Sequence, residues 1–349
     1  MTALDSTADL APAPAFAPAS PLGRREFLRW GLSASLATLG GVSAGARVSA
    51  DDAPPPSRTS PAGRPVAPSA DAIARGWIDS HSHVWTSDID AYPLKPGRRK
   101  EEMRPASFTP AELLAHAEPA GVTRVVLIQS SFYELDNAYM LDAIREHPGR
   151  FSGVAIIDPE KRPGARMKEL VAQGVRGYRL RPWDAPPDKW LDRAGIAEMW
   201  TTAADEGLAM TLLIDPPYLE SAGKMCAKFP RTPVVIDHFA RIGVDGEIRE
   251  RDLAALCALA KHPLMHVKAS AFGALGKKTA PYADLLPMVR RLCDAYGPDR
   301  LMWGTDCPYQ VLDGHTYRDS VELIRTHADF LAAGDREWIL RKTAEKVFW

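Results

Sequence analysis

The sequence has few cysteines, almost no net charge and no long apolar run, and each shortage excludes a class of protein. Its four cysteines form no C-x-x-C pair, which excludes a zinc ribbon and a dense disulfide framework. A formal net charge of -1 leaves no broad positive field that would hold nucleic acid. The weakly apolar run at 30–46 is too short and too rich in glycine and serine for a stable membrane span. With 46% hydrophobic and 25% charged residues, the 349-residue chain has the composition of a soluble globular protein.

Proline is abundant, with 30 residues, and its distribution divides the chain. Ten of the 30 lie in the first 68 positions, and six of those lie within residues 51–75 among serine, alanine and glycine. This composition cannot bury a core, so we expect 51–75 to be an extended, disordered linker. The folded part is then residues 76–349, which is close to the roughly 250 residues of a single (β/α)8 barrel.

The segment before the linker resembles a twin-arginine export signal. Its parts occur in the required order: Arg24-Arg25, Phe27-Leu28, the mildly apolar run at 30–46, and a small-x-small cleavage site at 48–50 or 44–46. The alternative is an amphipathic or anchoring N-terminal helix. The resemblance implies that residues 1–50 are a signal peptide read by the twin-arginine (Tat) export machinery. It also implies that the mature protein is exported to the periplasm.

Short apolar or β-branched runs recur through residues 76–349, with helical patterns between them. Near-continuous apolar strands separated by helices indicate a parallel sheet covered by helices, so we predict an α/β fold, a (β/α)8 TIM barrel. A doubly wound sheet would want a glycine-rich phosphate turn after the first strand, and the chain instead has Asp79-Ser80-His81-Ser82-His83 there. The eight predicted strands are Trp77–Ser80, Arg124–Gln129, Gly153–Ile157, Val175–Leu180, Met210–Ile214, Val234–Asp237, Met265–Ala269 and Leu301–Gly304.

Helix signals fill the intervals between the strands. Thr109-Pro110-Ala111-Glu112 is a capping box with proline at the first helical position. Helical periodicity also covers residues 163–173, 193–206, 249–261 and 283–296. The connection after the first strand is unusually long and carries a basic cluster at 98–100, so we interpret it as a lid over the site.

The C-terminal ends of the predicted strands carry polar side chains, and in a barrel the chemistry takes place at that end. Side chains i and i+2 of a strand share a face, so we expect Asp79, His81 and His83 to point the same way. Two imidazoles in an H-x-H at a strand end can bind one divalent cation, which makes His81 and His83 candidate metal ligands. The alternative is two surface histidines in a loop.

Two further candidates follow later strands. Asp306 comes directly after the last strand, where a carboxylate can ligate a metal, accept a proton from water, or do both. The alternative for Asp306 is a helix N-cap. His238 follows the sixth strand and is expected to project inward beside the first-strand pair, unless it is a core histidine. We predict Asp306 and His238 as catalytic residues.

Three arginines are candidates for binding substrate. Arg179 and Arg181 share a face at the end of the fourth strand. An arginine that points into a barrel mouth needs an anionic partner, either a structural carboxylate or a substrate carboxylate. Both partners stay open for Arg179, whereas the position of Arg181 nearer the rim favours substrate. Arg241, which follows the sixth strand, is the third candidate.

Four motifs carry a resemblance to a known family. From Trp77 to its end, the chain resembles the amidohydrolase superfamily, specifically the amidohydrolase-related branch. Within that branch it is most similar to the lactonases of pyrone dicarboxylate, fuconate and rhamnonate. The motifs appear in family order: Ile78-Asp79-Ser80-His81-Ser82-His83-Val84-Trp85 with Tyr92-Pro93, Gly177-Tyr178-Arg179-Leu180, Asp237-His238-Phe239, and Trp303-Gly304-Thr305-Asp306-Cys307-Pro308.

The resemblance implies one divalent ion, zinc or similar, held by His81, His83 and Asp306 with water completing the site. Metal-binding members usually supply another histidine at the end of strand five, where this chain has Asp215, either a substitute ligand or a loop cap. No lysine ends strand four to bridge two metals, so a binuclear site is not expected. The family also includes lactonases that work without metal, so metal-independent catalysis stays open.

The expected function is a hydrolase that opens a lactone or similar cyclic ester of an organic or sugar acid by water attack. Asp306 would accept the proton of the water, which His81 and His83, with or without metal, would hold unless they polarise the carbonyl. His238 would hydrogen-bond the oxyanion or position the substrate. Arg181 and Arg241 would orient a carboxylate or a polar sugar-like group. One alternative is a metal-dependent decarboxylase of an unsaturated or aromatic acid, and another is a non-catalytic exported binding protein. The expected partners are a small anionic substrate and the export machinery.

Overall fold

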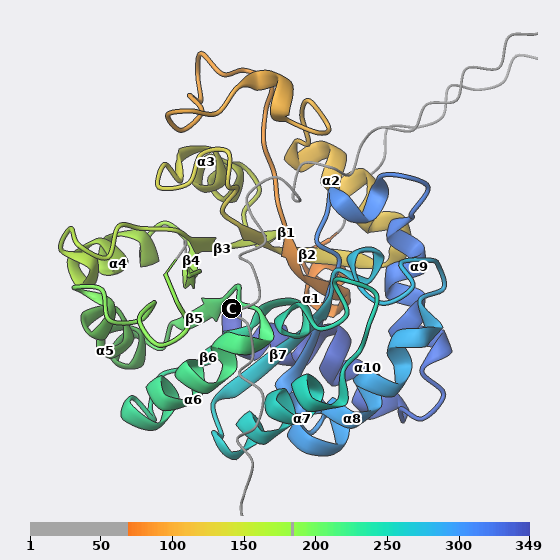
Figure 1. Ribbon diagram of the computed structural model, residues 1–349. Coiled ribbons are helices and arrows are strands. Elements are labelled where there is room, and N and C mark those ends of the chain that lie inside the picture. Colours follow the sequence, from red (N-terminus) through yellow and green to blue (C-terminus); the bar gives the residue numbers. More distant parts are fainter. Residues whose placement is uncertain (1–68, 183–184) are drawn as a thin grey trace, which may run out of the picture. The chain divides into compact units, whose positions relative to one another are not determined.

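The computed structural model describes residues 69–182 and 185–349, which form an eight-stranded parallel sheet covered by helices (Figure 1). The predicted signal segment and the linker up to residue 68 lie outside the described residues. Neighbouring strands pair in chain order, β1 to β8. The strands are β1 Trp77–Ser82, β2 Val122–Ile128, β3 Phe151–Ala155, β4 Val175–Leu180, β5 Ala209–Leu212, β6 Val234–Ile236, β7 Met265–Ser270 and β8 Leu301–Gly304.

The sheet closes into a barrel between β8 and β1. A parallel bridge joins Ser82 to Cys307. Beside it, the Asp306 amide donates to the His81 carbonyl at 2.7 Å and the His83 amide donates to the Cys307 carbonyl at 2.8 Å. The predicted (β/α)8 barrel is therefore confirmed, and each predicted strand agrees with an observed one to within two residues at either end. The closing hydrogen bonds lie at the residues that the sequence singles out as candidate ligands.

Helices alternate with the strands and cover the outside of the barrel (Figure 1). The capping box at Thr109 is present, and the periodic stretches form α4, α5, α7 and α8. None of the described helices is long and apolar enough to cross a bilayer. The helices are α1 Ala70–Arg75, α2 Pro110–Ala117, α3 Ala138–Glu146, α4 Pro163–Val171, α5 Ile196–Glu206, α6 Leu219–Lys228, α7 Glu250–Ala258, α8 Leu286–Tyr296, α9 Tyr317–Glu322, α10 Ala333–Glu337 and α11 Thr343–Phe348.

Helix α1 occupies the last six residues of the segment that composition assigns to an extended linker. The hydroxyl of Ser69 caps the helix by accepting from the Ala72 amide. Contacts with β2 then hold it, because Thr123 donates its hydroxyl hydrogen to the Ile73 carbonyl at 2.7 Å and Arg124 donates to the Ala74 carbonyl at 3.1 Å. These contacts join residues 50 positions apart, which is why proline and serine content did not reveal the helix.

A separate apolar cluster, formed by strand residues, fills the interior of the barrel, and the C-terminal helix α11 completes it. Phe348 and Ala344 of α11 are fully buried in it. Gly177 of β4 leaves room for this packing, since a Cβ there would lie 3.3 Å from the Phe348 ring. Phe348 therefore docks the last helix onto the barrel. The strand residues of the cluster are Ile78, Val126, Ile128, Val154, Ala209, Val235 and Met302.

Truncating Phe348 to alanine should lower the free energy of unfolding by about 3–5 kcal/mol, because the loss of a large buried ring leaves a cavity in the core. Urea denaturation followed by tryptophan fluorescence measures the change. Trp349→Ala is the matched control, because the Trp349 side chain is 38% exposed and its loss should cost roughly 0.5–1 kcal/mol. If both variants lost the same free energy of unfolding, the packing of Phe348 inside the barrel would not be what holds α11 in place.

Candidate active site

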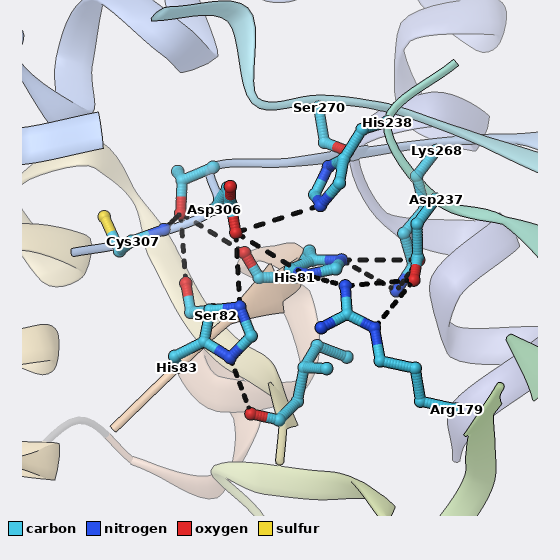
Figure 2. Close-up of polar contacts among 12 residues, drawn as sticks. His81, Ser82, His83, Arg179, Asp237, His238, Lys268, Ser270, Asp306 and Cys307 are labelled. Carbon is cyan, nitrogen blue, oxygen red and sulfur yellow. Dashed lines mark hydrogen bonds and ion pairs between the residues drawn. The ribbon is translucent and has the colours of Figure 1, made fainter. Parts of the chain in front are cut away.

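Four predicted residues meet at the C-terminal ends of three strands (Figure 2). His81 and His83 come from the end of β1, His238 follows β6, and Asp306 follows β8. The three imidazoles surround a single carboxylate oxygen. Asp306 Oδ1 lies 3.6 Å from His81 Nε2, 3.3 Å from His83 Nε2 and 3.8 Å from His238 Nε2. The sequence therefore identified a set of residues that the fold brings together.

Asp79 does not point with the two histidines, so the prediction of a shared face is wrong for this residue. Its carboxylate accepts hydrogen bonds from Ser82 Oγ at 2.7 Å and from the Tyr317 hydroxyl of α9 at 2.8 Å. The pairing of β1 with β2 shifts register between Asp79 and Ser82. Strict alternation holds only for a regular strand, and this irregularity directs His81 inward and turns Asp79 toward α9.

Gly304 allows β8 to run close beside the first metal-ligand candidate. A Cβ at this position would lie 3.0 Å from both the amide nitrogen and the Cβ of His81. Two residues later, Asp306 adopts a positive φ of 69°, which turns its side chain toward the imidazoles. The short sequence between Gly304 and Asp306 therefore sets the distance between the carboxylate and His81.

The hydrogen-bond partners of two imidazoles decide which nitrogen can face the site. His83 Nδ1 lies 2.8 Å from the Ile128 carbonyl, which can only accept, so Nδ1 carries the hydrogen and Nε2 keeps its lone pair. His238 Nδ1 lies 2.8 Å from Ser270 Oγ, which can donate or accept. Burial lowers the pKa of His238 to about 4. The His238 imidazole is therefore neutral at pH 7.

A buried charge cluster lies behind His81 (Figure 2). Asp237 Oδ2 lies 3.2 Å from Arg179 Nε and Asp237 Oδ1 lies 3.1 Å from Lys268 Nζ, and all three side chains are at least nine-tenths buried. Burial alone would raise the pKa of Asp237, but the charges of Lys268 and Arg179 outweigh it and hold this pKa well below the usual range. Asp237 also approaches His81 Nδ1, at 3.4 Å. Arg179 therefore has a structural carboxylate as its partner.

Two residues of β7 were missed by the sequence analysis. Lys268 lies 3.2 Å from His81 Nδ1, and Ser270 contacts His238. A lysine inside an apolar run is unusual in a barrel strand, because a charged amine is rarely buried without a partner. Lys268 and Ser270 also stand at i and i+2, so they share the inward face of β7. Together these two signals could have found them.

The other two arginines lie at the rim, where each pairs with a carboxylate. Arg181 Nη2 contacts Glu134 Oε1 at 2.6 Å, and Glu134 also pairs with Lys95 of the long first connection. Arg241 Nη1 contacts Asp215 Oδ1 at 2.9 Å. The long connection is thus tied to the end of β4. A role for these arginines in substrate binding stays a prediction.

The residues fit a mononuclear divalent metal site. Among the described residues, the group able to hold a metal ion is His81, His83 and Asp306, whose ligand atoms lie within 4.8 Å of one another. Two imidazole nitrogens and a carboxylate oxygen form a common catalytic zinc donor set. Ligands at about 2.0–2.1 Å in a tetrahedron are separated by roughly 3.3 Å, close to the 3.3 Å and 3.6 Å from Asp306 Oδ1 to the two imidazoles. Asp215 is not part of this group.

Comparisons with known proteins agree with this geometry. A family profile described as Amidohydrolase matches residues 78–348. An L-fucono-1,5-lactonase of Burkholderia ambifaria is 30% identical over 244 residues, which cover 68% of this chain and 82% of the relative. A 4-sulfomuconolactone hydrolase of Rhizobium radiobacter is 26% identical over 266 residues, which cover 76% of this chain and 86% of the relative.

A solved structure gives the same fold. The crystal structure of an amidohydrolase from Burkholderia multivorans with bound zinc superposes with a TM-score of 0.66 and 22% sequence identity. The alignment covers 78% of this chain and 98% of that chain. At this identity, the likeness establishes the barrel architecture.

Proposed function

Because the chain belongs to the amidohydrolase family and the two relatives described above are lactone hydrolases, it is a lactonase-like hydrolase, and we propose that its substrate is an anionic lactone or similar cyclic ester of an organic or sugar acid. The observation that carries this proposal is the convergence of three imidazoles on one oxygen of Asp306. A carboxylate held in this way is a general base beside groups that can polarise a carbonyl.

Asp306 takes the proton from the attacking water in the proposed reaction. Its side chain is 17% exposed, so water reaches it from the mouth, and the three imidazoles lie on its buried side. His238 can present an Nε2 hydrogen to the developing oxyanion when Ser270 donates its hydroxyl hydrogen to Nδ1. Because the His238 imidazole stays neutral at pH 7, it stabilises the oxyanion as a hydrogen-bond donor.

We further propose that His81, His83 and Asp306 hold one divalent ion, for which zinc is the best match to the donor set. Bound there, such an ion would lower the pKa of a bound water to about 7, which would supply hydroxide at neutral pH. The tautomer of His83 is already set for this role by the Ile128 carbonyl.

Arg181 and Arg241 are proposed to orient the anionic group of the substrate. Both lie at the rim and are about one-third exposed, so a substrate carboxylate can approach them from solvent. Guanidinium groups bind carboxylates in bidentate fashion, which fixes the plane of the substrate relative to Asp306.

The test is a hydrolysis panel on the purified full chain. The panel contains sugar-acid 1,5-lactones and unsaturated lactones that carry a carboxylate, and acid release is followed with a pH indicator. We expect turnover of at least one lactone, a loss of 90% or more of activity after dialysis against a chelator, and recovery with zinc. Carbon dioxide release from unsaturated or aromatic acids, with no lactone turnover, would contradict the proposal. Full activity in the chelated, metal-free chain would refute the metal site alone.

A further inference from the structure

Arg179 contacts the nitrogen of His81 that faces the proposed metal site. Its Nη2 lies 3.2 Å from His81 Nε2 (Figure 2). A guanidinium has donors only and stays charged, so Nε2 must supply the lone pair in this contact. That lone pair is the same one that a metal ion would use.

The opposite side of the imidazole supports this assignment. A neutral imidazole has one acceptor nitrogen and one donor nitrogen. The tautomer with hydrogen on Nδ1 directs it toward Asp237 Oδ1, 3.4 Å away, and leaves Nε2 to accept from Arg179. Lys268 Nζ also lies 3.2 Å from Nδ1, but an ammonium has donors only, so in this tautomer it pairs with Asp237 Oδ1, 3.1 Å away, and not with the ring.

Asp237 keeps the guanidinium in place. Arg179 Nε and Nη2 both lie 3.2 Å from Asp237 Oδ2, and the Asp237 side chain is fully buried. Arg179 extends from β4 beside β5, its backbone paired with Thr211, and the end of β5 offers no histidine. Arg179 thus donates to His81 from beside a strand end that has no histidine to offer as a metal ligand.

We propose that Arg179 competes with the metal ion for the His81 lone pair, so that the site binds its metal weakly and exchangeably. This inference rests on the proposed assignment of His81, His83 and Asp306 as ligands. The apparent affinity for metal is the intrinsic affinity multiplied by the fraction of molecules in which Arg179 has given up the lone pair. Repulsion between the guanidinium and the divalent ion acts in the same direction.

The experiment compares zinc affinities of the full chain and three variants, measured by competition with a chromophoric chelator. Arg179→Met removes both the charge and the competing donor and should tighten zinc binding by about 30-fold or more. Lys268→Met removes a cation from the Nδ1 side of the same ring and should tighten it by at most about fivefold. Arg124→Met removes a buried arginine that pairs with Glu345, away from the site, and should leave the affinity unchanged.

Three outcomes would overturn the competition. Equal tightening by Arg179→Met and Lys268→Met would show that only general charge repulsion acts. Unchanged or weaker binding in Arg179→Met would show that Arg179 supports the metal, and an absence of zinc binding in all variants would remove the site. If Arg179→Met does not fold, Arg179→Gln takes its place, because it removes the charge and keeps a hydrogen-bond donor for Asp237. The lactone panel on the unmodified chain reports separately on the proposed hydrolase.

Discussion

Replacing Asp306 with asparagine is expected to reduce kcat for lactone hydrolysis by about three orders of magnitude. The amide cannot accept a proton from water, and it is a poorer ligand for a divalent ion. Asparagine tolerates the left-handed backbone, so the φ of 69° at this position adds no strain. Steady-state kinetics on the best lactone of the panel measures the loss, with circular dichroism to confirm that the barrel is intact.

Asp313→Asn is the matched control for this variant. Asp313 lies in the same loop after β8, also has a positive φ, of 52°, and is exposed. The same chemical change at this position should leave kcat within about twofold, because no reacting group lies beside it. Turnover of Asp306→Asn near that of the unmodified chain would make the general-base assignment wrong.

Replacing Asp79 with alanine is expected to lower the free energy of unfolding by about 3–5 kcal/mol. The buried carboxylate accepts hydrogen bonds from two backbone amides and three hydroxyls, and alanine leaves all five donors without it. These donors come from β1, the segment after β8, and α9. The loss of the acceptor that they share therefore loosens the junction that closes the barrel. The donors are His81 N, Thr305 N, Ser82 Oγ, Thr305 Oγ1 and the Tyr317 hydroxyl.

Tyr317→Phe is the control for Asp79→Ala, because it removes one donor and keeps the ring. Its cost should be about 1 kcal/mol. Urea denaturation of both variants gives the comparison, and lactone kinetics should show a larger loss of kcat in Asp79→Ala, because Asp79 contacts the backbone of His81 and the residue before Asp306. Similar stabilities of the two variants would show that Asp79 is not the central acceptor of the junction.

The barrel could be predicted from the sequence because most of its strands are short apolar runs separated by helical patterns. A run such as Val125-Val126-Leu127-Ile128 of β2 is readable without any tertiary information. The four converging residues were also readable, since His81, His83, His238 and Asp306 closely follow the ends of predicted strands, and the carboxyl ends of parallel strands meet at one face. The resemblance to the amidohydrolase family, drawn from the same motifs, is confirmed by the match over residues 78–348.

The rest of the site depends on contacts that local pattern does not encode. The direction of Asp79 follows from a register shift in β1, which is visible only once β2 is paired with it. The partner of Arg179 is Asp237, which is 58 residues away and directly follows β6, so the choice between a structural and a substrate carboxylate needed the fold. Lys268 of β7 pairs with Met302 of β8, and it reaches His81 of β1 only because the barrel closes between β8 and β1.

Arg124 at the start of β2 binds both ends of the described chain. Its guanidinium donates to the Ala74 carbonyl of α1 and to Glu345 of α11, and it lies 5.2 Å from the centre of the Trp349 ring. The strand order around the barrel is also the order along the chain. The eight units therefore form a topological circle, and the two ends of the described chain meet at Arg124. A circular permutant that joins the two ends there and opens the chain in another surface loop would keep every strand pairing, so the position of the first residue is separable from the architecture of the barrel.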